Sequence, residues 1–244
     1  TNRGEMFQML LPPSYPGSSL LQWIGNFFIK RAQKIEQSHR QVKYIRAKKA
    51  VCLSTGGFIF NRQMVKEYAP KYFDGMPLGT SNDQGCGIRL GQSVGGKTNH
   101  MNRVTAWRFL NPPLAFANGI VVNKEGKRFC NEMVYGATLG DAMCEHNGGK
   151  AYLILDAKLF EDAKKQSNEA LPFQRDMAKM LMYFNAKKKK NLNDIAKIYN
   201  LCAKNLTSEV IKYNKAAKEG ISCEFGKGAN DVKELNGPFT AFTL

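Results

Sequence analysis

The chain has 244 residues, of which 43% are hydrophobic and 23% are charged, a globular composition that suits one large domain or two small ones. No apolar run approaches the roughly 20 residues that cross a bilayer, so we expect no integral membrane segment. The net charge of +16 is spread along the chain, and its densest run, Lys187–Lys190, lacks the arginines and interleaved aromatics of a nucleic-acid platform. We therefore expect no nucleic acid partner, and a basic nucleic-acid-binding protein is kept only as an alternative.

The cysteines and histidines indicate no metal site. Six cysteines are scattered without a CxxC pair, and the three histidines lie far apart in the sequence. Cysteines in apolar company, such as Cys52 in the run Ala50–Leu53, are typical of buried thiols in a reducing compartment. No basic-then-apolar signal pattern follows Thr1, and we expect a cytoplasmic protein.

The N-terminal part begins with loop and helix patterns. Residues 12–19 have loop composition, and Leu20–Ile29 is predicted to be helical before a polar stretch. Gln41–Ser54 alternates and then becomes continuously apolar, which predicts a buried strand.

A glycine turn and a short helix follow this predicted strand. The turn is Thr55–Gly57, and Asn61 is a candidate N-cap for a helix over Arg62–Tyr68 that stops at Pro70. A glycine turn of this kind lets the backbone approach a ligand closely, with helix N–H groups directed at it. Plain α/β loops show the same pattern.

A second glycine loop, Ser81–Gly87, leads into Ile88–Val94. Its glycines at 85, 87 and 91 nearly imitate the dinucleotide fingerprint. The spacing is GxGxxxG, however, and no strand is predicted before it, so we do not interpret it as a Rossmann phosphate loop.

The second half is predicted to mix strands and helices, after a boundary near residue 100. A hairpin is expected with Ile120–Asn123 as one strand and Lys127–Phe129 as the return, and Ala151–Leu155 is a further strand. Helices are expected over Ala137–His146 and Leu159–Gln166.

Two apolar stripes at helical spacing follow, starting at Leu192 and Leu206. Thr207 is a possible N-cap of the second helix and Gly220 its stop signal. The lysines of residues 186–219 are expected on the solvated faces of these helical segments.

Taken in order, these segments resemble the FAD-dependent fumarate reductase/3-ketosteroid dehydrogenase superfamily. The resemblance covers most of residues 42–244 and rests on Lys48–Phe58, Gly79–Ile88, Gly119–Glu132, Ala151–Asp156, Tyr213-Asn214, Phe225–Lys227 and Pro238–Ala241.

The resemblance implies a partial FAD-binding, Rossmann-like α/β domain with an inserted α+β capping domain. Residues 1–100 would belong to the FAD-binding domain and residues 101–244 to the capping domain, ending where the chain would return to the flavin domain. The family's N-terminal βαβ unit and its closing C-terminal segment are not found in these 244 residues. We therefore expect a fragment, or joined pieces, whose partners include the missing N- and C-terminal parts of the same protein.

The resemblance also implies FAD as the cofactor. The cofactor-binding residues implied by the two glycine loops are Ser54, Thr55, Gly56, Gly57, Asp83, Gly85 and Cys86. Cys86 stands where the family has an aspartate that contacts FAD, and a thiol is a poor hydrogen-bonding partner. Asp83 either substitutes for that aspartate or forms an Asx-turn.

The residues that the family uses for fumarate reduction are absent. Its proton-relay positions hold Pro112, Ala115 and Gly136, and the position of its substrate-binding histidine falls near Trp107. Fumarate reduction is therefore not expected.

The resemblance to ketosteroid dehydrogenases leaves one tyrosine as a candidate acid/base group. Tyr135 lies three residues after Glu132, and Thr240 replaces the family's second tyrosine. Tyr135 is thus either catalytic or a structural tyrosine of the capping domain, and Glu132 either acts in catalysis or pins the hairpin through backbone N–H groups. The expected function is a dehydrogenase or reductase of a ketone or steroid-like substrate, with a degenerate, inactive flavoprotein as the alternative.

Overall fold

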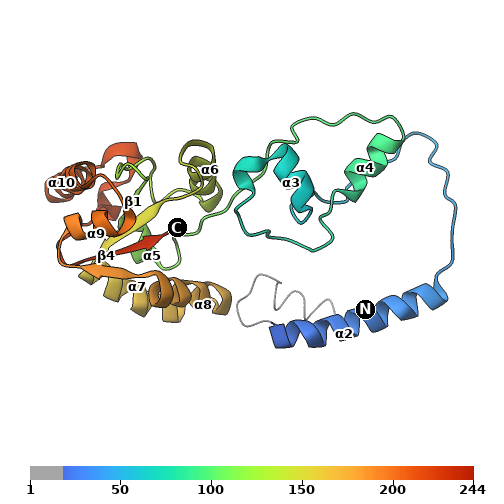
Figure 1. Ribbon diagram of the computed structural model, residues 1–244, viewed down its shortest axis with the longest axis horizontal. Helices are drawn as coiled ribbons and strands as arrows, with labels where there is room; N and C mark the ends of the chain where they lie inside the picture. The colour runs from blue at the N-terminus through green and yellow to red at the C-terminus, as the bar shows by residue number, and fades with distance from the viewer. Residues whose placement is uncertain (1–18) are drawn as a thin grey trace. The chain divides into compact units, whose positions relative to one another are not determined.

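The computed structural model describes residues 19–244, which divide into two compact units with the boundary between Arg103 and Val104 (Figure 1). Most of the loop predicted over residues 12–19 lies outside the described residues. Within residues 19–244, no helix combines the length and apolar character needed to cross a membrane. That the first unit belongs to a flavin domain and the second to a capping domain stays a prediction.

The first unit is built from helices joined by long connections. Helix α2 spans Ser19–His39 and contains the predicted Leu20–Ile29. Helix α3 covers Arg62–Tyr68, and the 3-10 turn η1 begins at Pro70. The predicted cap is confirmed, because the Asn61 side chain accepts a hydrogen bond from the Met64 N–H at 3.1 Å. Helix α4 spans Cys86–Ser93.

The strand predicted over Gln41–Ser54 does not form in the structure. The side chains of Val51 and Leu53 are 76% and 46% exposed. A strand needs a neighbouring strand to pair with its backbone N–H and C=O groups, and the described residues of this unit form no strand. The prediction of a buried strand is therefore wrong in both respects, because the segment is unpaired and its apolar side chains are exposed.

The prediction of buried thiols was also wrong for most of the cysteines. Cys130 alone among the six is buried, Cys144 and Cys223 are half-buried, and Cys52, Cys86 and Cys202 are exposed. Cys52 is exposed for the same reason as its neighbours in the unpaired segment.

The second unit is organised around a four-stranded antiparallel sheet in the order β1-β2-β4-β3. The strands are β1 (Ile120–Val122), β2 (Tyr152–Asp156), β3 (Lys187–Lys189) and β4 (Phe239–Thr243). The last strand in sequence therefore lies inside the sheet, with Ile154 of β2 opposite Ala241 of β4.

Helices surround this sheet (Figure 1). Their bounds are α5 Leu114–Ala117, α6 Gly136–His146, α7 Ala157–Glu169, α8 Pro172–Met180, α9 Leu192–Tyr199 and α10 Ala203–Glu219, with a single π-helical turn, η2, at Leu181–Asn185 and 3-10 turns at Glu224–Gly226 and Ala229–Asp231. Phe242 of β4 packs against Phe116 of α5 and Phe160 of α7, with ring centroids 5.6 and 6.0 Å apart. This contact places the core between the sheet and these helices.

Three local predictions for this unit need correction. The return of the first hairpin pairs through one bridge, Val122 to Arg128, because the chain after it turns inward. Helix α10 begins at Ala203 with Cys202 at the N-cap, so Thr207 lies inside the helix. The lysines at 187–189 form an edge strand rather than a helix, because β4 offers its free side for pairing. The stop at Gly220 is confirmed, with φ +64°.

Candidate functional site

The two glycine loops of the first unit meet in the structure. The Gly85 N–H donates to the Gly57 carbonyl at 2.9 Å, and the Phe60 N–H donates to the Asp83 carbonyl at 3.0 Å. The sequence placed these loops about 28 positions apart, and the fold brings them side by side. Helix α4 begins directly after the second loop.

Close packing explains the glycines at 56 and 79. Both have positive φ, +77° and +138°, and a Cβ at either position would run into the Asp83 carboxylate. The Asp83 carboxylate also accepts a hydrogen bond from the Thr80 N–H, three residues earlier, at 3.3 Å. This is not the Asx-turn considered from the sequence, because the N–H two residues later, that of Gly85, donates to the Gly57 carbonyl instead. Asp83 thus holds its own loop against the other one.

The remaining predicted cofactor residues differ in their surroundings. A Cβ on Gly85, at φ +74°, would come within 2.7 Å of Met64 Sδ, and one on Gly87 would overlap the Thr55 side chain. A Cβ on Gly57 would meet no protein atom within 4 Å. Gly57 therefore leaves an uncovered backbone edge, which fits a group that approaches the chain closely.

Cys86 is the first residue of α4, and its thiol lies 3.5 Å from an Arg89 guanidinium nitrogen. These residues fit a flavin nucleotide, because Ser54–Gly57 and the first turn of α4 would present backbone N–H groups to a ligand at the uncovered backbone of Gly57. That these residues contact FAD stays a proposal.

Glu132 occupies the centre of a buried ion network in the second unit. Its Oε1 accepts from the Val121 N–H and from Arg128 Nε, each at 3.0 Å. Its Oε2 accepts from an Arg128 Nη at 2.8 Å and from Lys227 Nζ at 3.2 Å. Both carboxylate oxygens are therefore fully engaged, and the contact with the Val121 N–H is the hairpin-pinning interaction considered from the sequence.

Lys227 and Tyr213 extend this network to the segment before β1. Lys227 Nζ donates to the Gly119 carbonyl at 2.7 Å, and Tyr213 Oη donates to the Asn118 carbonyl at 2.7 Å. Burial lowers the pKa of Lys227 and raises the pKa of Tyr213. Two consecutive carbonyls are thus held by residues about 100 positions later in the chain.

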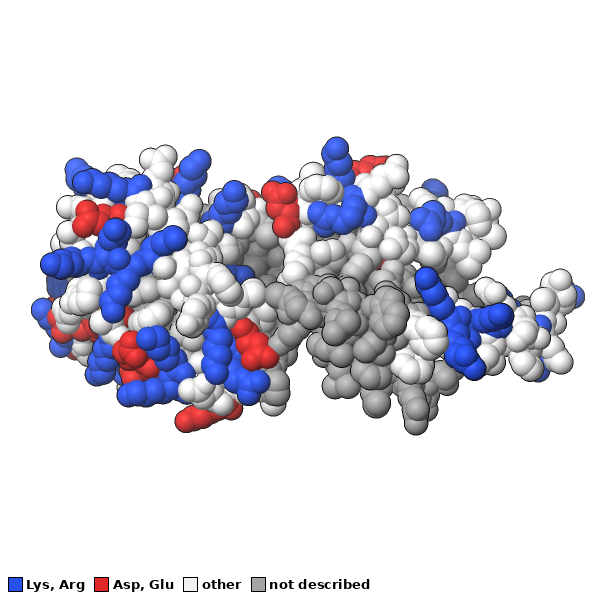
Figure 2. All heavy atoms as spheres, turned by 60° about the horizontal axis from the view of Figure 1, so that its bottom comes forward, with Lys and Arg blue, Asp and Glu red and all other residues white. Residues whose placement is uncertain are grey.

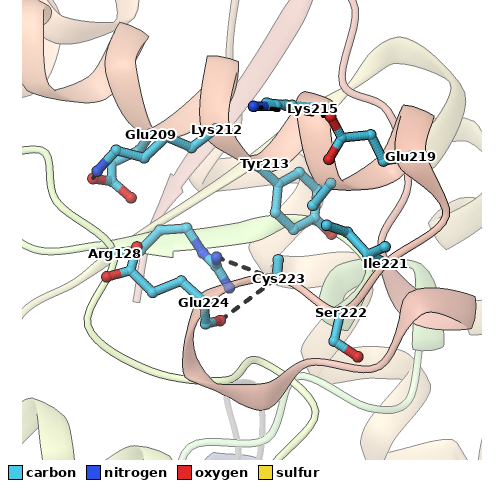
Figure 3. A pocket seen from close by; sticks show the side chains of 11 residues that line it. Arg128, Glu209, Lys212, Tyr213, Lys215, Glu219, Ile221, Ser222, Cys223 and Glu224 are labelled. Carbon is cyan, nitrogen blue, oxygen red and sulfur yellow. Dashed lines mark hydrogen bonds and ion pairs between the residues drawn. The ribbon is translucent and has the colours of Figure 1, made fainter.

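A cavity of about 240 Å³ lies between α10 and the turn at Ile221–Glu224, beside this network (Figure 3). Arg128 points across it to Cys223, whose sulfur lies 3.3 Å from a guanidinium nitrogen. The rest of its rim carries Lys212 and Lys215 beside Glu209 and Glu219, so its charges are balanced. Nothing in this lining selects a charged ligand.

Tyr135 lies at the N-terminus of α6 in an exposed aromatic cluster. Its side chain is 64% exposed, and its ring meets that of Trp107 edge to face at a centroid distance of 4.7 Å. Trp107 in turn contacts Phe109, with centroids 5.2 Å apart. The cluster brings together the predicted site residue Tyr135 and Trp107, near which the resemblance would place the substrate-binding histidine of the fumarate reductases.

Two glycines of α6 allow this cluster to form. The Arg108 N–H donates to the Gly136 carbonyl at 2.9 Å. A Cβ on Gly136 would come within 3.0 Å of the Arg108 carbonyl oxygen, and one on Gly140 would overlap the Ala106 carbonyl group. The extended segment 106–109 therefore lies in a groove that small residues at i and i+4 create, and this spacing was the available sequence signal.

A cavity of about 270 Å³ opens beside Tyr135. Its lining includes Phe109, Asn111 and Gln174, which the sequence analysis did not single out. Gln174 comes from α8, so no local pattern could have associated it with Tyr135. Within residues 19–244, no cluster of three or more His, Cys, Asp or Glu side chains could hold a metal ion.

Comparisons with known proteins agree on one family. The chain matches the FAD binding domain family over residues 29–244. It is 40% identical over 169 residues to 3-oxo-5-alpha-steroid 4-dehydrogenase of Comamonas testosteroni, covering 68% of this chain and 32% of that protein. It is 26% identical to 3-oxosteroid 1-dehydrogenase of Mycobacterium tuberculosis, covering 88% of this chain and 41% of that protein.

Among solved structures, the fold is similar to 3-ketosteroid-delta4-(5alpha)-dehydrogenase of Rhodococcus jostii in complex with 4-androstene-3,17-dione. The TM-score is 0.66 at 28% identity, and the match covers 82% of this chain and 40% of that one. The chain therefore spans about a third to two fifths of the length of these relatives. The chain belongs to the FAD-binding domain family, within the superfamily of fumarate reductases and 3-ketosteroid dehydrogenases, and its cofactor is FAD.

Proposed function

We propose that the protein to which this chain belongs is an FAD-dependent oxidoreductase that exchanges a hydride with a ketone of steroid-like shape. The observation that supports this most is the exposed cluster of Trp107, Phe109 and Tyr135 beside a cavity of about 270 Å³. Aromatic rings at a cavity rim suit a flat apolar substrate, and the tyrosine adds one polar group that can exchange a proton. Relatives that act on oxosteroids, by their names, point to the same substrate class.

FAD, when bound, supplies the acceptor or donor of the hydride. In this proposal Tyr135 Oη moves the accompanying proton, as a general acid or base in reach of the substrate carbon or carbonyl. Phe109 lines the cavity and offers ring surface to the substrate, whereas Trp107 packs against the rings of both Phe109 and Tyr135. Trp107 also restrains Tyr135 through their edge-to-face contact.

We assign Glu132 a positioning role rather than a second acid/base role. All of its acceptor capacity toward the protein is taken by Val121, Arg128 and Lys227. It holds the turn that leads to Tyr135, three residues later, against the start of β1. Reduction of fumarate is not part of the proposal, because Pro112 and Ala115 carry no acid where the fumarate reductases of the family have their relay.

The test is Tyr135→Phe in the full-length protein, assayed with a 3-ketosteroid and an artificial electron acceptor. Loss of a general acid/base group typically lowers turnover by about 10²–10⁴-fold. Flavin content and substrate affinity should stay near those of the wild type, because the ring and its contact with Trp107 are kept. Tyr183→Phe, which removes a hydroxyl from another exposed tyrosine of the same unit, is the control. Near-full turnover in Tyr135→Phe would assign Tyr135 a structural role.

A second candidate, a flavoprotein without activity, is favoured by one observation. Cys86 replaces the aspartate that the resemblance leads one to expect at a flavin contact, and its nearest polar partner here is Arg89. The absorbance spectrum of the purified full-length protein separates the two: a colourless protein that takes up no FAD on titration supports the degenerate flavoprotein.

A further inference from the structure

A basic segment with two exposed aromatic rings lies at the edge of the sheet in the second unit. Residues 171–190 contain six Lys and Arg and one acidic residue. Tyr183 and Phe184 in this segment are 88% and 81% exposed, although large aromatic rings are usually covered. We call Tyr183, Phe184 and Lys187–Lys190 the basic aromatic edge.

The turn η2, which carries the rings, and strand β3, which carries the lysines, are both attached to β4. Asn185 exchanges two hydrogen bonds with Thr243 of β4, from its amide nitrogen to the carbonyl at 2.8 Å and from the Thr243 N–H to its amide oxygen at 3.3 Å. Two residues later, Lys187 pairs with Ala241 of β4. The turn with the rings ends at Asn185 and the strand with the lysines begins at Lys187, so both lie along β4 at the same edge of the sheet.

Buried side chains of the core anchor the basic aromatic edge. Met182 is buried in the core, and Tyr199 Oη donates to the Ala241 carbonyl at 3.1 Å and lies 3.4 Å from the Asn185 carbonyl oxygen. The rings of Tyr183 and Phe184 are 6.1 Å apart at their centroids. Anchoring on both sides of the rings means that their exposure is imposed by the fold and not by a loose tail.

The charges around the rings select an anionic partner. Lys187, Lys188 and Lys189 are all exposed on the edge strand, and Lys188 lies near enough to Glu161 of α7 to lower the pKa of that carboxyl, after the larger effect of Lys164. Figure 2 shows Lys and Arg side chains scattered over the surface in that view, with Asp and Glu side chains beside several of them. Among residues 19–244, no carboxylate forms an ion pair with these lysines, and Glu161 has its own partner in Lys164, at 2.9 Å.

We propose that the basic aromatic edge docks on the surface of an anionic lipid bilayer. A bilayer interface takes aromatic rings at the level of the headgroups and lysine ammonium groups at the phosphates. The long lysine stems allow the charges to reach the phosphates while the rings enter deeper. This inference goes beyond the proposed oxidoreductase function and does not depend on the substrate.

Nucleic acid fits this edge less well. The two ring planes are inclined by 57°, so successive bases could not stack in parallel on both. The run Lys187–Lys190 also contains no arginine, the residue that stacks on bases and grips phosphates with two hydrogen bonds.

The experiment measures binding of the full-length, FAD-loaded protein to vesicles of phosphatidylcholine alone or mixed with phosphatidylserine, at low and high salt. Two variants probe the edge: Lys187→Gln/Lys188→Gln/Lys189→Gln and Tyr183→Ser/Phe184→Ser. Two matched controls change exposed residues elsewhere in the same unit: Lys124→Gln/Lys127→Gln/Lys204→Gln and Ile211→Ser. A single-stranded oligonucleotide serves as the competing anionic probe.

We expect binding to the mixed vesicles only, weakened by salt. Each lysine near an anionic surface is worth about fivefold in affinity, so the triple lysine variant should lose on the order of a hundredfold. The ring variant should lose about tenfold or more, and the controls should stay within about threefold of the wild type. The proposal is overturned if the mixed vesicles do not bind, if edge and control variants lose affinity equally, or if the oligonucleotide binds more tightly than the vesicles. It is also overturned if the ring variant releases FAD or loses thermal stability without a change in vesicle binding, because the rings would then be covered by the rest of the protein.

Discussion

Replacing Glu132 by glutamine should destabilise the second unit strongly. The glutamine keeps the shape of the side chain and an acceptor for the Val121 N–H, but it removes the negative charge between Arg128 and Lys227. Side chains of Glu132 and Lys227 have no exposed surface, and that of Arg128 has almost none, so water cannot replace the lost charge. Breaking a buried pair in this way costs about 3–5 kcal/mol.

That cost is a large share of the roughly 5–15 kcal/mol by which a folded domain is stable. The control is Glu161→Gln, which breaks the exposed ion pair with Lys164 and should cost about 0–1 kcal/mol. Lys227→Met in the Glu132→Gln background removes one of the stranded cations, so the double variant should be less destabilised than the sum of the two single changes.

Urea unfolding of the full-length protein measures these differences, with far-ultraviolet circular dichroism and the fluorescence of Trp107 as probes of this unit. The reasoning about the buried network is refuted if Glu132→Gln unfolds at the same urea concentration as Glu161→Gln. A stable Glu132→Gln protein with abolished turnover would instead move Glu132 from a positioning role to a catalytic one.

Three further changes have defined expectations. Burial raises the pKa of Cys130 from its usual 9.0 to about 12, so between these pH values the folded state keeps a proton that the unfolded state loses. The free energy of unfolding should therefore fall as pH rises from about 9 to 12, by up to about 1.4 kcal/mol per pH unit. In urea titrations the difference between wild type and Cys130→Ala should show this slope, and a difference that does not change with pH would contradict it. Gly140→Ala places a Cβ against the Ala106 carbonyl and should displace Trp107, with a loss of stability of about 1–3 kcal/mol and reduced turnover; unchanged Trp107 fluorescence and turnover would contradict it. Residues 1–244 alone should bind FAD more weakly than micromolar by calorimetry, because the family's phosphate-binding βαβ unit is not among them; tighter binding would mean that the main cofactor contacts lie elsewhere.

Features with short-range causes could be predicted from the sequence. Asn61 caps α3 and Gly220 ends α10, because a cap depends on residues within one turn of helix. The strands at Ile120–Val122 and Tyr152–Asp156 and the apolar stripe of α9 could be predicted from the spacing of apolar residues, because burying these residues in the core stabilises the fold. The family could also be inferred, since it rests on the order of several local motifs.

Features that depend on a distant partner were decided by the tertiary structure. Gln41–Ser54 has the composition of a strand but no neighbour to pair with, whereas Lys187–Lys189 has the composition of a solvated surface and becomes a strand because β4 accepts it. One of the two ion-pair partners of Glu132 is Lys227, 95 residues away, and Tyr135 meets Trp107 because two glycines of α6 admit the segment 106–109. Such contacts are made by side chains and backbones that only the fold brings within a few ångströms. The spacing of Gly136 and Gly140 indicates that a neighbour can approach α6 closely, but it does not say which segment that neighbour is.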